Sequence, residues 1–271
     1  LPRVLSGGAH SGAPGGPGWT AFVRPMRRGA RDCVERVLSS PVPTELAAFL
    51  DRVCGLIASR LGAVADRTAI EDIRCLHGGK MLRSRLAGRL MLSGVGQAGP
   101  ERVAFAAAAV EMVHTASLCH DDVIDSALLR RAVPTLWRRT SSSGAVLVGD
   151  LLLCEAMNLL LETRDHCLLS AFMSRVTTVC LTEARQELVY RGRQVDEETC
   201  LELAGGKTGA LFEFVAEACA GDDAPLAAAM ARAGYCVGTA YQLADDLLDT
   251  TGCEAQAGKT LGTDHKREKF T

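Results

Sequence analysis

Two segments of the chain carry three aspartates each in the same spacing, namely Asp121, Asp122 and Asp125, then Asp245, Asp246 and Asp249. On a helix, residues i and i+4 lie on one face, so the first and last aspartate of each segment should lie one turn apart. Carboxylates crowded in this way repel one another unless a cation lies between them. Oxygen ligands favour hard cations, and Mg²⁺ keeps some waters and accepts phosphate oxygens. Two facing copies therefore predict a site for several Mg²⁺ ions and a diphosphate.

The residues around the two acidic motifs indicate whether the aspartates form a binding site or a solvated surface. A single charged helix face is usually just solvated. Here the residues before Asp121 are His-Thr-Ala-Ser-Leu-Cys-His, and those before Asp245 are Gly-Thr-Ala-Tyr-Gln-Leu-Ala. Two copies in such largely apolar sequence favour a functional site over surface charge.

The composition limits the fold and the partners. The chain has 271 residues, of which 48% are hydrophobic but only 4% aromatic, so its core must be built from Ala, Leu and Val, which favours helices. A net charge of −2 argues against nucleic-acid binding, which needs a surplus of Lys and Arg. The 11 cysteines include no CxxC pair, a pattern typical of reduced, buried thiols in a cytoplasmic protein.

Two segments bear on localisation. No run reaches the ~18 uninterrupted apolar residues of a membrane span, and the best candidate, 145–161, is interrupted by Asp150 and Glu155. We therefore expect no transmembrane segment. Residues 1–31 are rich in Gly and Pro and contain no acidic residue. An organelle-targeting leader is one interpretation of this segment, and a flexible tail over residues 1–43 is the favoured one.

The elements that must position these side chains are helices. Apolar residues recur at three- and four-residue spacing after residue 43, and breaks fall at residues 96–100, 141–144 and 221–225. This periodicity predicts helices over 44–63, 67–95, 101–124, 144–162, 166–190, 197–204, 207–220 and 224–249. No strand is expected. The predicted fold is all-α, a single-domain helical bundle around a central cavity over residues 44–271.

Basic residues near glycines and near the first acidic motif could hold phosphate. Lys80 and Arg83 lie one turn apart after Gly78-Gly79, and Arg130 and Arg131 follow Asp125 closely. The planar guanidinium of arginine donates two parallel hydrogen bonds to phosphate. Each of these residues alone would more often be a solvated surface charge.

Further candidates lie elsewhere in the chain. Lys207 and Thr208 follow a glycine pair and precede an apolar helix, so its N-terminal N–H groups could add to anion binding. Lys259 follows the second acidic motif. His114 lies two turns before Asp121 and could donate to a phosphate or be a satisfied core residue, while His120 has no assignable role.

These motifs together resemble the trans-isoprenyl diphosphate synthases, also called polyprenyl synthetases, of the medium- to long-chain type. The resemblance runs from about Leu76 to Thr271. The matching blocks, in order, are Gly-Gly-Lys80-x-x-Arg83, His114 to Asp125, Leu-Arg130-Arg131, Gly149-Asp150, Lys207-Thr208, Tyr241-Gln242-x-x-Asp245-Asp246-x-x-Asp249 and Gly258-Lys259-x-x-Gly262-x-Asp264.

The resemblance implies a prenyltransferase that joins isopentenyl diphosphate to an allylic diphosphate, head to tail, with three Mg²⁺ ions per active site. It implies metal ligation by Asp121, Asp125 and Asp245, supported by Asp122, Asp246 and Asp249. It implies that the allylic diphosphate contacts Arg130, Lys207, Lys259, Thr208 and Gln242. It implies that isopentenyl diphosphate contacts Lys80, Arg83, His114 and Arg131.

The resemblance also bears on product length and assembly. Small residues at Ala116 and Ser117, with Val113 one turn earlier, would leave a tunnel open along the helix that carries Asp121, which predicts a product of C20 or longer. A homodimer is implied, with close packing at the Ala-rich residues 104–109. Peripheral contact with a membrane is expected for product release.

Several departures and alternatives stand beside this interpretation. Met81, Ser84, Ala132 and Tyr241 differ from the residues usual in the family, and the chain ends shortly after the second motif, where family members continue, so it is expected to be truncated. A class I terpene cyclase would also ionise a diphosphate, but it typically lacks the Lys80, Arg83 and His114 set. A non-catalytic partner subunit of a heteromeric synthase would tend to lose an acidic motif.

Overall fold

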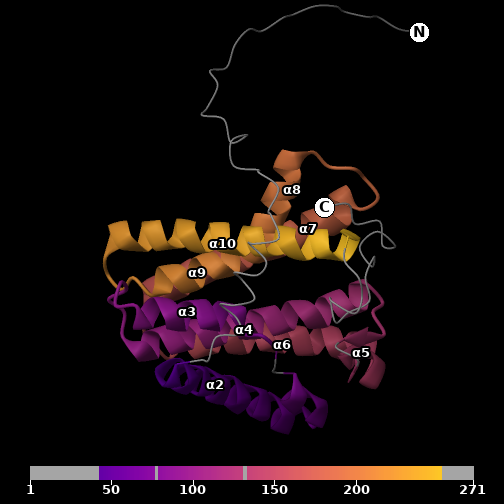
Figure 1. Ribbon diagram of the computed structural model, residues 1–271. Helices are drawn as coiled ribbons and strands as arrows, with labels where there is room; N and C mark the ends of the chain where they lie inside the picture. The colour runs from indigo at the N-terminus through magenta and orange to yellow at the C-terminus, as the bar shows by residue number, and fades with distance from the viewer. Residues whose placement is uncertain (1–42, 77–78, 131–132, 252–271) are drawn as a thin grey trace, which may run out of the picture. The chain divides into compact units, whose positions relative to one another are not determined.

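The computed structural model describes residues 43–76, 79–130 and 133–251, which are almost entirely helical (Figure 1). Their α-helices are α2 (Thr44–Thr68), α3 (Leu82–Leu92), α4 (Pro100–Ile124), α5 (Leu136–Arg139), α6 (Ser142–Leu161), α7 (His166–Arg185), α8 (Glu197–Ala204), α9 (Ala210–Ala218) and α10 (Ala224–Thr251). A 3₁₀ segment, η2 (Glu71–Cys75), follows α2. Two π-helical segments, η3 (Gln186–Tyr190) and η4 (Gly205–Gly209), continue α7 and join α8 to α9. The all-α prediction is confirmed.

The single helix expected over 67–95 is wrong. Ala69, which follows α2, has φ 58°, and Met81, which precedes α3, has φ 46°. Residues other than glycine rarely adopt this left-handed backbone conformation, and an α-helix ends where it occurs. Gly79 between them has φ 125°. The break lets the chain turn before α3, so that Lys80 precedes that helix and Arg83 lies in its first turn.

A two-stranded hairpin follows α4, although no strand was expected. Strand β1 (Leu129–Arg130) pairs antiparallel with β2 (Val133–Pro134). Two donors hold the base of the hairpin, because Thr135 Oγ1 and Trp137 Nε1 both donate to the Ala127 carbonyl, at 2.8 and 2.7 Å. These bonds fix the backbone that carries Arg130 beside the end of α4.

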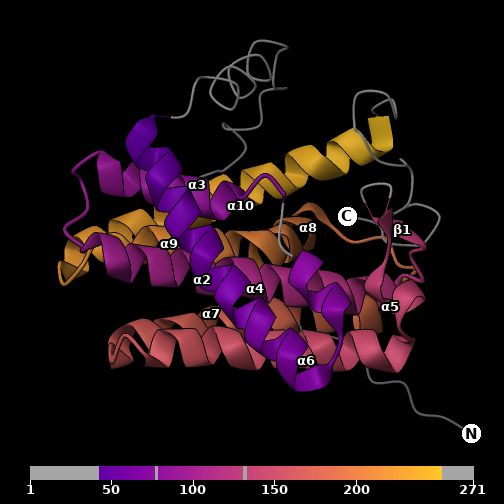
Figure 2. The ribbon, with the colours of Figure 1, turned by 90° about the horizontal axis from the view of Figure 1, so that it is seen from below.

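Helix α4 is at the centre of the bundle. It packs against α2, α3, α6 and α9, and α2 crosses it obliquely when the molecule is seen from below (Figure 2). Ala104 and the alanines at 106–109 are at most 1% exposed in the single chain. The expectation that residues 104–109 serve a subunit interface is therefore wrong, since these alanines let helices of one chain approach closely.

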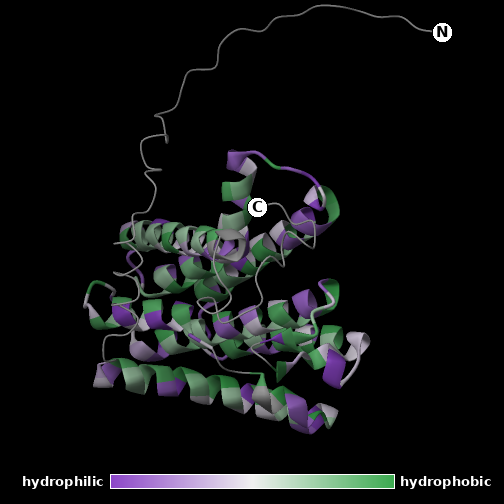
Figure 3. Cartoon of the chain, turned by 45° about the vertical axis from the view of Figure 1, so that its right-hand side comes forward, coloured by the Kyte–Doolittle hydropathy of each residue, from purple (hydrophilic) through white to green (hydrophobic). Residues whose placement is uncertain are grey.

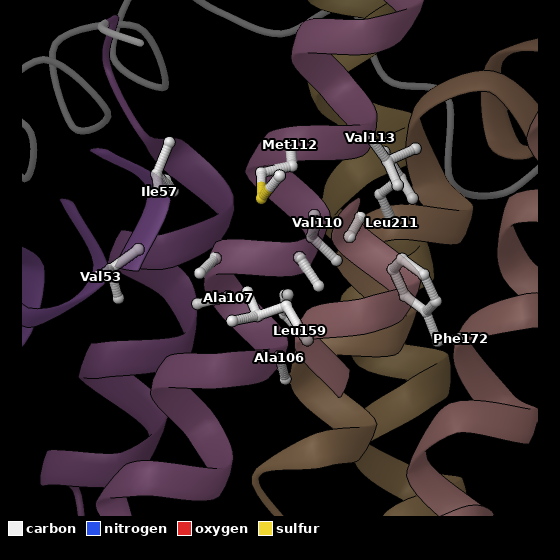
Figure 4. Packing of buried hydrophobic residues seen from close by; sticks show 14 of the residues in the cluster. Val53, Ile57, Ala106, Ala107, Val110, Met112, Val113, Leu159, Phe172 and Leu211 are labelled. Atoms are coloured by element: carbon white, nitrogen blue, oxygen red, sulfur yellow. The ribbon is translucent and has the colours of Figure 1, made fainter. Parts of the chain in front are cut away.

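Buried hydrophobic residues pack against α4 on two sides. Val53 and Ile57 of α2 lie on one side of α4, while Val113 of α4 lies close to Leu211 and Phe172 on the other (Figure 4). Hydrophobic and hydrophilic residues alternate along α2 (Figure 3). This is the pattern of a helix that covers a core with one face only.

Helices α4 and α6 are long and apolar enough to cross a membrane by length and composition alone. The most hydrophobic window of α4 is 67% buried inside the bundle and that of α6 is 39% buried. The two helices pack extensively against each other. Burial in a protein core accounts for the hydropathy of α4, and α6 keeps an exposed apolar face, which includes Val146, Leu147 and Leu151.

We expect Phe172→Ala to lower the free energy of unfolding by about 3–5 kcal/mol, because it leaves a cavity beside a second aromatic ring. Phe172 of α7 is 1% exposed and meets Phe214 of α9 edge to face, with ring centroids 5.3 Å apart. Urea denaturation followed by circular dichroism measures the change. Phe172→Leu, which keeps most of the volume, should cost much less, and equal costs for the two variants would contradict this account.

Candidate active site

The first acidic motif lies at the C-terminal end of α4, where neighbouring aspartates have different partners. Asp122 is 5% exposed and accepts hydrogen bonds from Arg130 Nε, at 3.0 and 3.2 Å, and from Nη2, at 2.7 Å. Successive residues of a helix point about 100° apart, and Asp121 instead faces Lys207. The structure thus places Asp122 on the arginine that was expected to bind a diphosphate, where it orients that side chain.

Lys207 of η4 lies between two carboxylates. Its Nζ is 2.7 Å from Glu183 Oε1 of α7 and 4.0 Å from Asp121 Oδ2 of α4. Burial alone would lower the pKa of Lys207, but the charges of Asp121 and Glu183, with a smaller contribution from Asp125, raise it above its ordinary value. The ammonium group therefore stays protonated and provides a fixed positive charge beside the first motif.

The next residue, Thr208, leads to the second acidic motif on α10. Its Oγ1 donates to Gln242 Oε1. The Gln242 Nε2 in turn donates to Asp246 Oδ1 at 2.8 Å. Consecutive residues of η4 are thus tied to both acidic motifs, which the sequence separates widely. This arrangement brings Lys207, Thr208, Gln242 and the two motifs into one site.

The expected N-terminal anion site at residues 205–209 is wrong. The helix is continuous from α8 through η4 into α9, so its N–H groups there lie inside the helix. The glycines serve close packing instead. A Cβ on Gly205 would lie 2.0 Å from Tyr235 Oη, and one on Gly206 would lie 2.2 Å from Thr182 Oγ1. Only glycine lets η4 approach α7 and α10 this closely.

Arg83 of α3 is a part-buried cation. Its guanidinium carbon lies 5.3 Å from the centroid of the Phe212 ring of α9, and its buried Nε has no hydrogen-bond partner among the described residues. Burial lowers the pKa of Arg83, while the charge of Glu111 acts in the opposite direction. A buried donor without a partner is costly, so this geometry suits an arginine that binds an anionic ligand.

Glu111 of α4 faces Arg83 and is itself held in place. Its Oε1 accepts from the backbone N–H of Ser84 at 3.2 Å and from Ser84 Oγ at 2.9 Å. Ser84 stands where family members usually carry proline, which has no N–H to donate. Lys80 is exposed on the segment before α3, and its carbonyl accepts from Arg85 Nε at 2.9 Å.

The remaining predicted residues are placed as follows. His114 is part-buried, and its carbonyl accepts from Ser117 Oγ at 2.9 Å. Val113 is 3% and Ala116 0% exposed, so both side chains fill the core beside the site. Their role in product length stays a prediction. Arg131 and Lys259 lie outside the described residues. Asp249 lies on α10, but its side chain is outside them too.

Glu183 and Glu111 are site residues that the sequence interpretation missed. Glu183 is a single acid on an amphipathic helix and looks like an ordinary solvated charge. Glu111 gave a readable signal, because it stands in the apolar run Ala-Ala-Val-Glu-Met-Val. A carboxylate there is buried by its neighbours and must find partners.

The sequence predicted reduced, buried cysteines. Eight cysteines whose side chains the structure describes are free, but Cys154, Cys167, Cys180 and Cys236 are exposed, so the expectation of buried thiols is only partly correct. Burial raises the pKa of Cys119 to about 12, with help from the charge of Asp122. This thiol next to the acidic motif therefore stays neutral.

The donor set fits a divalent cation that binds together with a phosphate ligand. Within the described ranges, no three His, Cys, Asp or Glu side chains are grouped closely enough to hold a metal ion by themselves. Mg²⁺ usually takes only one or two carboxylates and completes its shell with water and phosphate oxygens. The aspartates of the two motifs offer such oxygens on either side of Lys207 and Thr208.

Comparison with known proteins agrees with this geometry. The family model described as "Polyprenyl synthetase" matches residues 68–271. The all-trans-nonaprenyl-diphosphate synthase (geranyl-diphosphate specific) of Rhodobacter capsulatus is 33% identical over 86% of this chain and 71% of its own length. Component 2 of the heptaprenyl diphosphate synthase of Geobacillus stearothermophilus is 34% identical over 84% of this chain and 71% of its own length.

A solved structure gives the same result for the fold. The polyprenyl synthase of Caulobacter crescentus CB15, complexed with calcium and isoprenyl diphosphate, superposes with a TM-score of 0.74 and 31% identity, over 83% of this chain and 69% of that one. The chain spans between 49% and 71% of the length of curated relatives that it matches. These relatives are named as prenyl diphosphate synthases, which are prenyltransferases. The chain belongs to the polyprenyl synthetase family.

Proposed function

We propose that the chain catalyses the head-to-tail condensation of isopentenyl diphosphate with an allylic diphosphate to give an all-trans polyprenyl diphosphate. The observation that carries the proposal is the position of η4, where Lys207 contacts the first acidic motif and Thr208 is linked through Gln242 to the second. One cationic segment between two acidic motifs suits a diphosphate held jointly by divalent cations and lysine.

The allylic diphosphate would be bound by this part of the site. Asp121, Asp125, Asp245 and Asp249 would hold Mg²⁺, three ions with substrate bound. These ions would supply the positive charge that stabilises the leaving diphosphate as the allylic C–O bond ionises. Lys207 adds a fixed charge in a part-buried position, and Arg130 is oriented by Asp122. The released diphosphate would accept the proton lost at the end of the reaction.

Isopentenyl diphosphate would be bound by cations alone, since it must not ionise. Arg83, with Lys80, His114 and Arg131, is the proposed set. The guanidinium of Arg83, whose Nε is buried, lies against Phe212 and next to Tyr241, the residue before Gln242. The second binding position would then lie beside the first.

Product length and assembly are proposed from the relatives and from the surface of α6. Two relatives are named for long products, nonaprenyl and heptaprenyl, and support a product of C20 or longer, while another is named a short chain isoprenyl diphosphate synthase. The exposed leucines and valine of α6 support a homodimer through that helix, since large apolar side chains gather there. The name "component 2" of one relative supports a heteromer as the second candidate.

Cytoplasmic localisation, with peripheral membrane contact during product release, remains a proposal from the sequence.

The test is a product analysis. The purified chain is incubated with Mg²⁺, labelled isopentenyl diphosphate and, separately, dimethylallyl, geranyl or farnesyl diphosphate, and dephosphorylated products are identified by mass spectrometry. Linear all-trans prenols are the expected result. Cyclic hydrocarbons without label would instead indicate a terpene cyclase. Product that forms only after a partner subunit is added would favour the heteromer.

A further inference from the structure

The proposed function leaves unused a contact between α4 and α6, beside the first acidic motif. His120, the residue before Asp121, directs its imidazole toward α6. Its Nε2 lies 3.2 Å from the Val146 carbonyl oxygen and 3.3 Å from Asp150 Oδ1. A carbonyl can only accept, so Nε2 carries a hydrogen whatever the charge of the ring.

Gly149 of α6 makes room for this ring. A Cβ at residue 149 would lie 2.2 Å from His120 Nε2 and 2.6 Å from Cδ2, so the imidazole would have to leave its present position. Val146, Gly149 and Asp150 are spaced i, i+3 and i+4, so they share one face of α6. On that face, Val146 supplies a hydrogen-bond acceptor, Gly149 leaves room for the ring, and Asp150 supplies a carboxylate.

The contact lies where α4 most needs restraint. Asp125 already caps the helix, and Ser126 after it has φ 52°. Helix ends fray, and Asp121 must keep its place opposite Lys207 through this last turn. The imidazole links the last turn of α4 to the side of α6. Helix α6 carries no other part of the proposed site.

We propose that His120 is a positioning residue, which fixes Asp121 by donating from Nε2 to the Val146 carbonyl, beside the carboxylate of Asp150 and across the space left by Gly149. The inference rests on the proposed function, because a displaced Asp121 weakens binding of Mg²⁺ and a diphosphate only if Asp121 is a metal ligand. Residues that orient metal ligands in this way typically change metal affinity or activity by about 10- to 100-fold when they are altered.

The experiment measures binding rather than turnover. The full chain is titrated with Mg²⁺ in the presence of inorganic diphosphate by isothermal titration calorimetry. We expect His120→Phe, which keeps a flat ring but loses the donor, to weaken Mg²⁺-dependent binding by about 10-fold or more. His120→Gln keeps an N–H donor at similar reach and should stay close to the unaltered chain. Gly149→Ala should resemble His120→Phe although His120 is intact.

A matched control uses His166, which is exposed at the first residue of α7. His166→Phe should bind Mg²⁺ and diphosphate normally, and thermal melting shows whether each variant is folded. Normal binding by His120→Phe, or equal losses in His120→Phe and His120→Gln, would overturn the inference alone. If the unaltered chain shows no Mg²⁺-dependent diphosphate binding, the proposed function falls and the inference falls with it.

Discussion

Asp121→Asn is expected to reduce turnover by about 1000-fold or more, because several kcal/mol of charge stabilisation would be lost with the carboxylate. The substitution keeps the shape of the side chain and removes its charge. Lys207 retains Glu183 at 2.7 Å, so the lysine is not left unpaired and the fold should persist. Initial rates at saturating substrates measure the loss, and thermal melting checks the fold.

The control for this variant is Asp51→Asn, on the exposed face of α2 away from both acidic motifs. It removes one negative charge without touching the site and should turn over normally. The rate of Asp121→Asn should also recover in part at raised Mg²⁺ concentration. Turnover within tenfold of the unaltered chain would show that Asp121 is not a metal ligand and that Lys207 is placed beside it for another reason.

Arg83→Met is expected to raise the KM for isopentenyl diphosphate by about 10- to 100-fold, since a hydrogen bond to a charged group contributes about 1.5–3 kcal/mol. Methionine keeps an unbranched chain beside the Phe212 ring but has no charge and no N–H donor. The KM for the allylic diphosphate should hardly change, because that substrate is proposed to bind at Lys207 and the aspartates. Steady-state kinetics with each substrate varied in turn separates the two values.

Arg83→Lys is the matched comparison. It keeps the charge but loses the planar pair of donors, so its KM for isopentenyl diphosphate should lie between that of the unaltered chain and that of the Arg83→Met variant. Equal increases in both KM values would contradict the assignment. That result would mean that Arg83 supports the bundle through Phe212 and Glu111 rather than one substrate.

The sequence predicted those parts of the molecule that depend on local spacing. Helical periodicity gave the all-α fold, and the repeated acidic spacing singled out Asp121 and Asp245. Local spacing does not give the direction of a side chain on its helix. It therefore grouped Asp122 with Asp121, whereas the helix turns Asp122 away to Arg130.

The features that sequence reasoning missed depend on neighbours from distant segments or on unusual backbone. The left-handed conformation of Met81 divides a stretch that reads as one helix, and nothing in the identity of methionine indicates it. Glu183 gains its importance only because Lys207 of another helix lies 2.7 Å away. The glycines 205 and 206 look like a phosphate-binding turn until Tyr235 and Thr182 are seen against them.

The π-helical segment η4 makes the site depend on the number of residues as well as on their identity. A π-turn holds one more residue than an α-turn, and one residue corresponds to about 100° of rotation around a helix. Deletion of a single residue from the five of η4 would restore an α-helical register and turn its two halves relative to each other. Lys207 and Thr208 could not then both keep their partners, although every motif would remain in the sequence. The arrangement of Lys207 and Thr208 can thus be lost through a one-residue deletion. A comparison of motifs alone would not detect such a deletion.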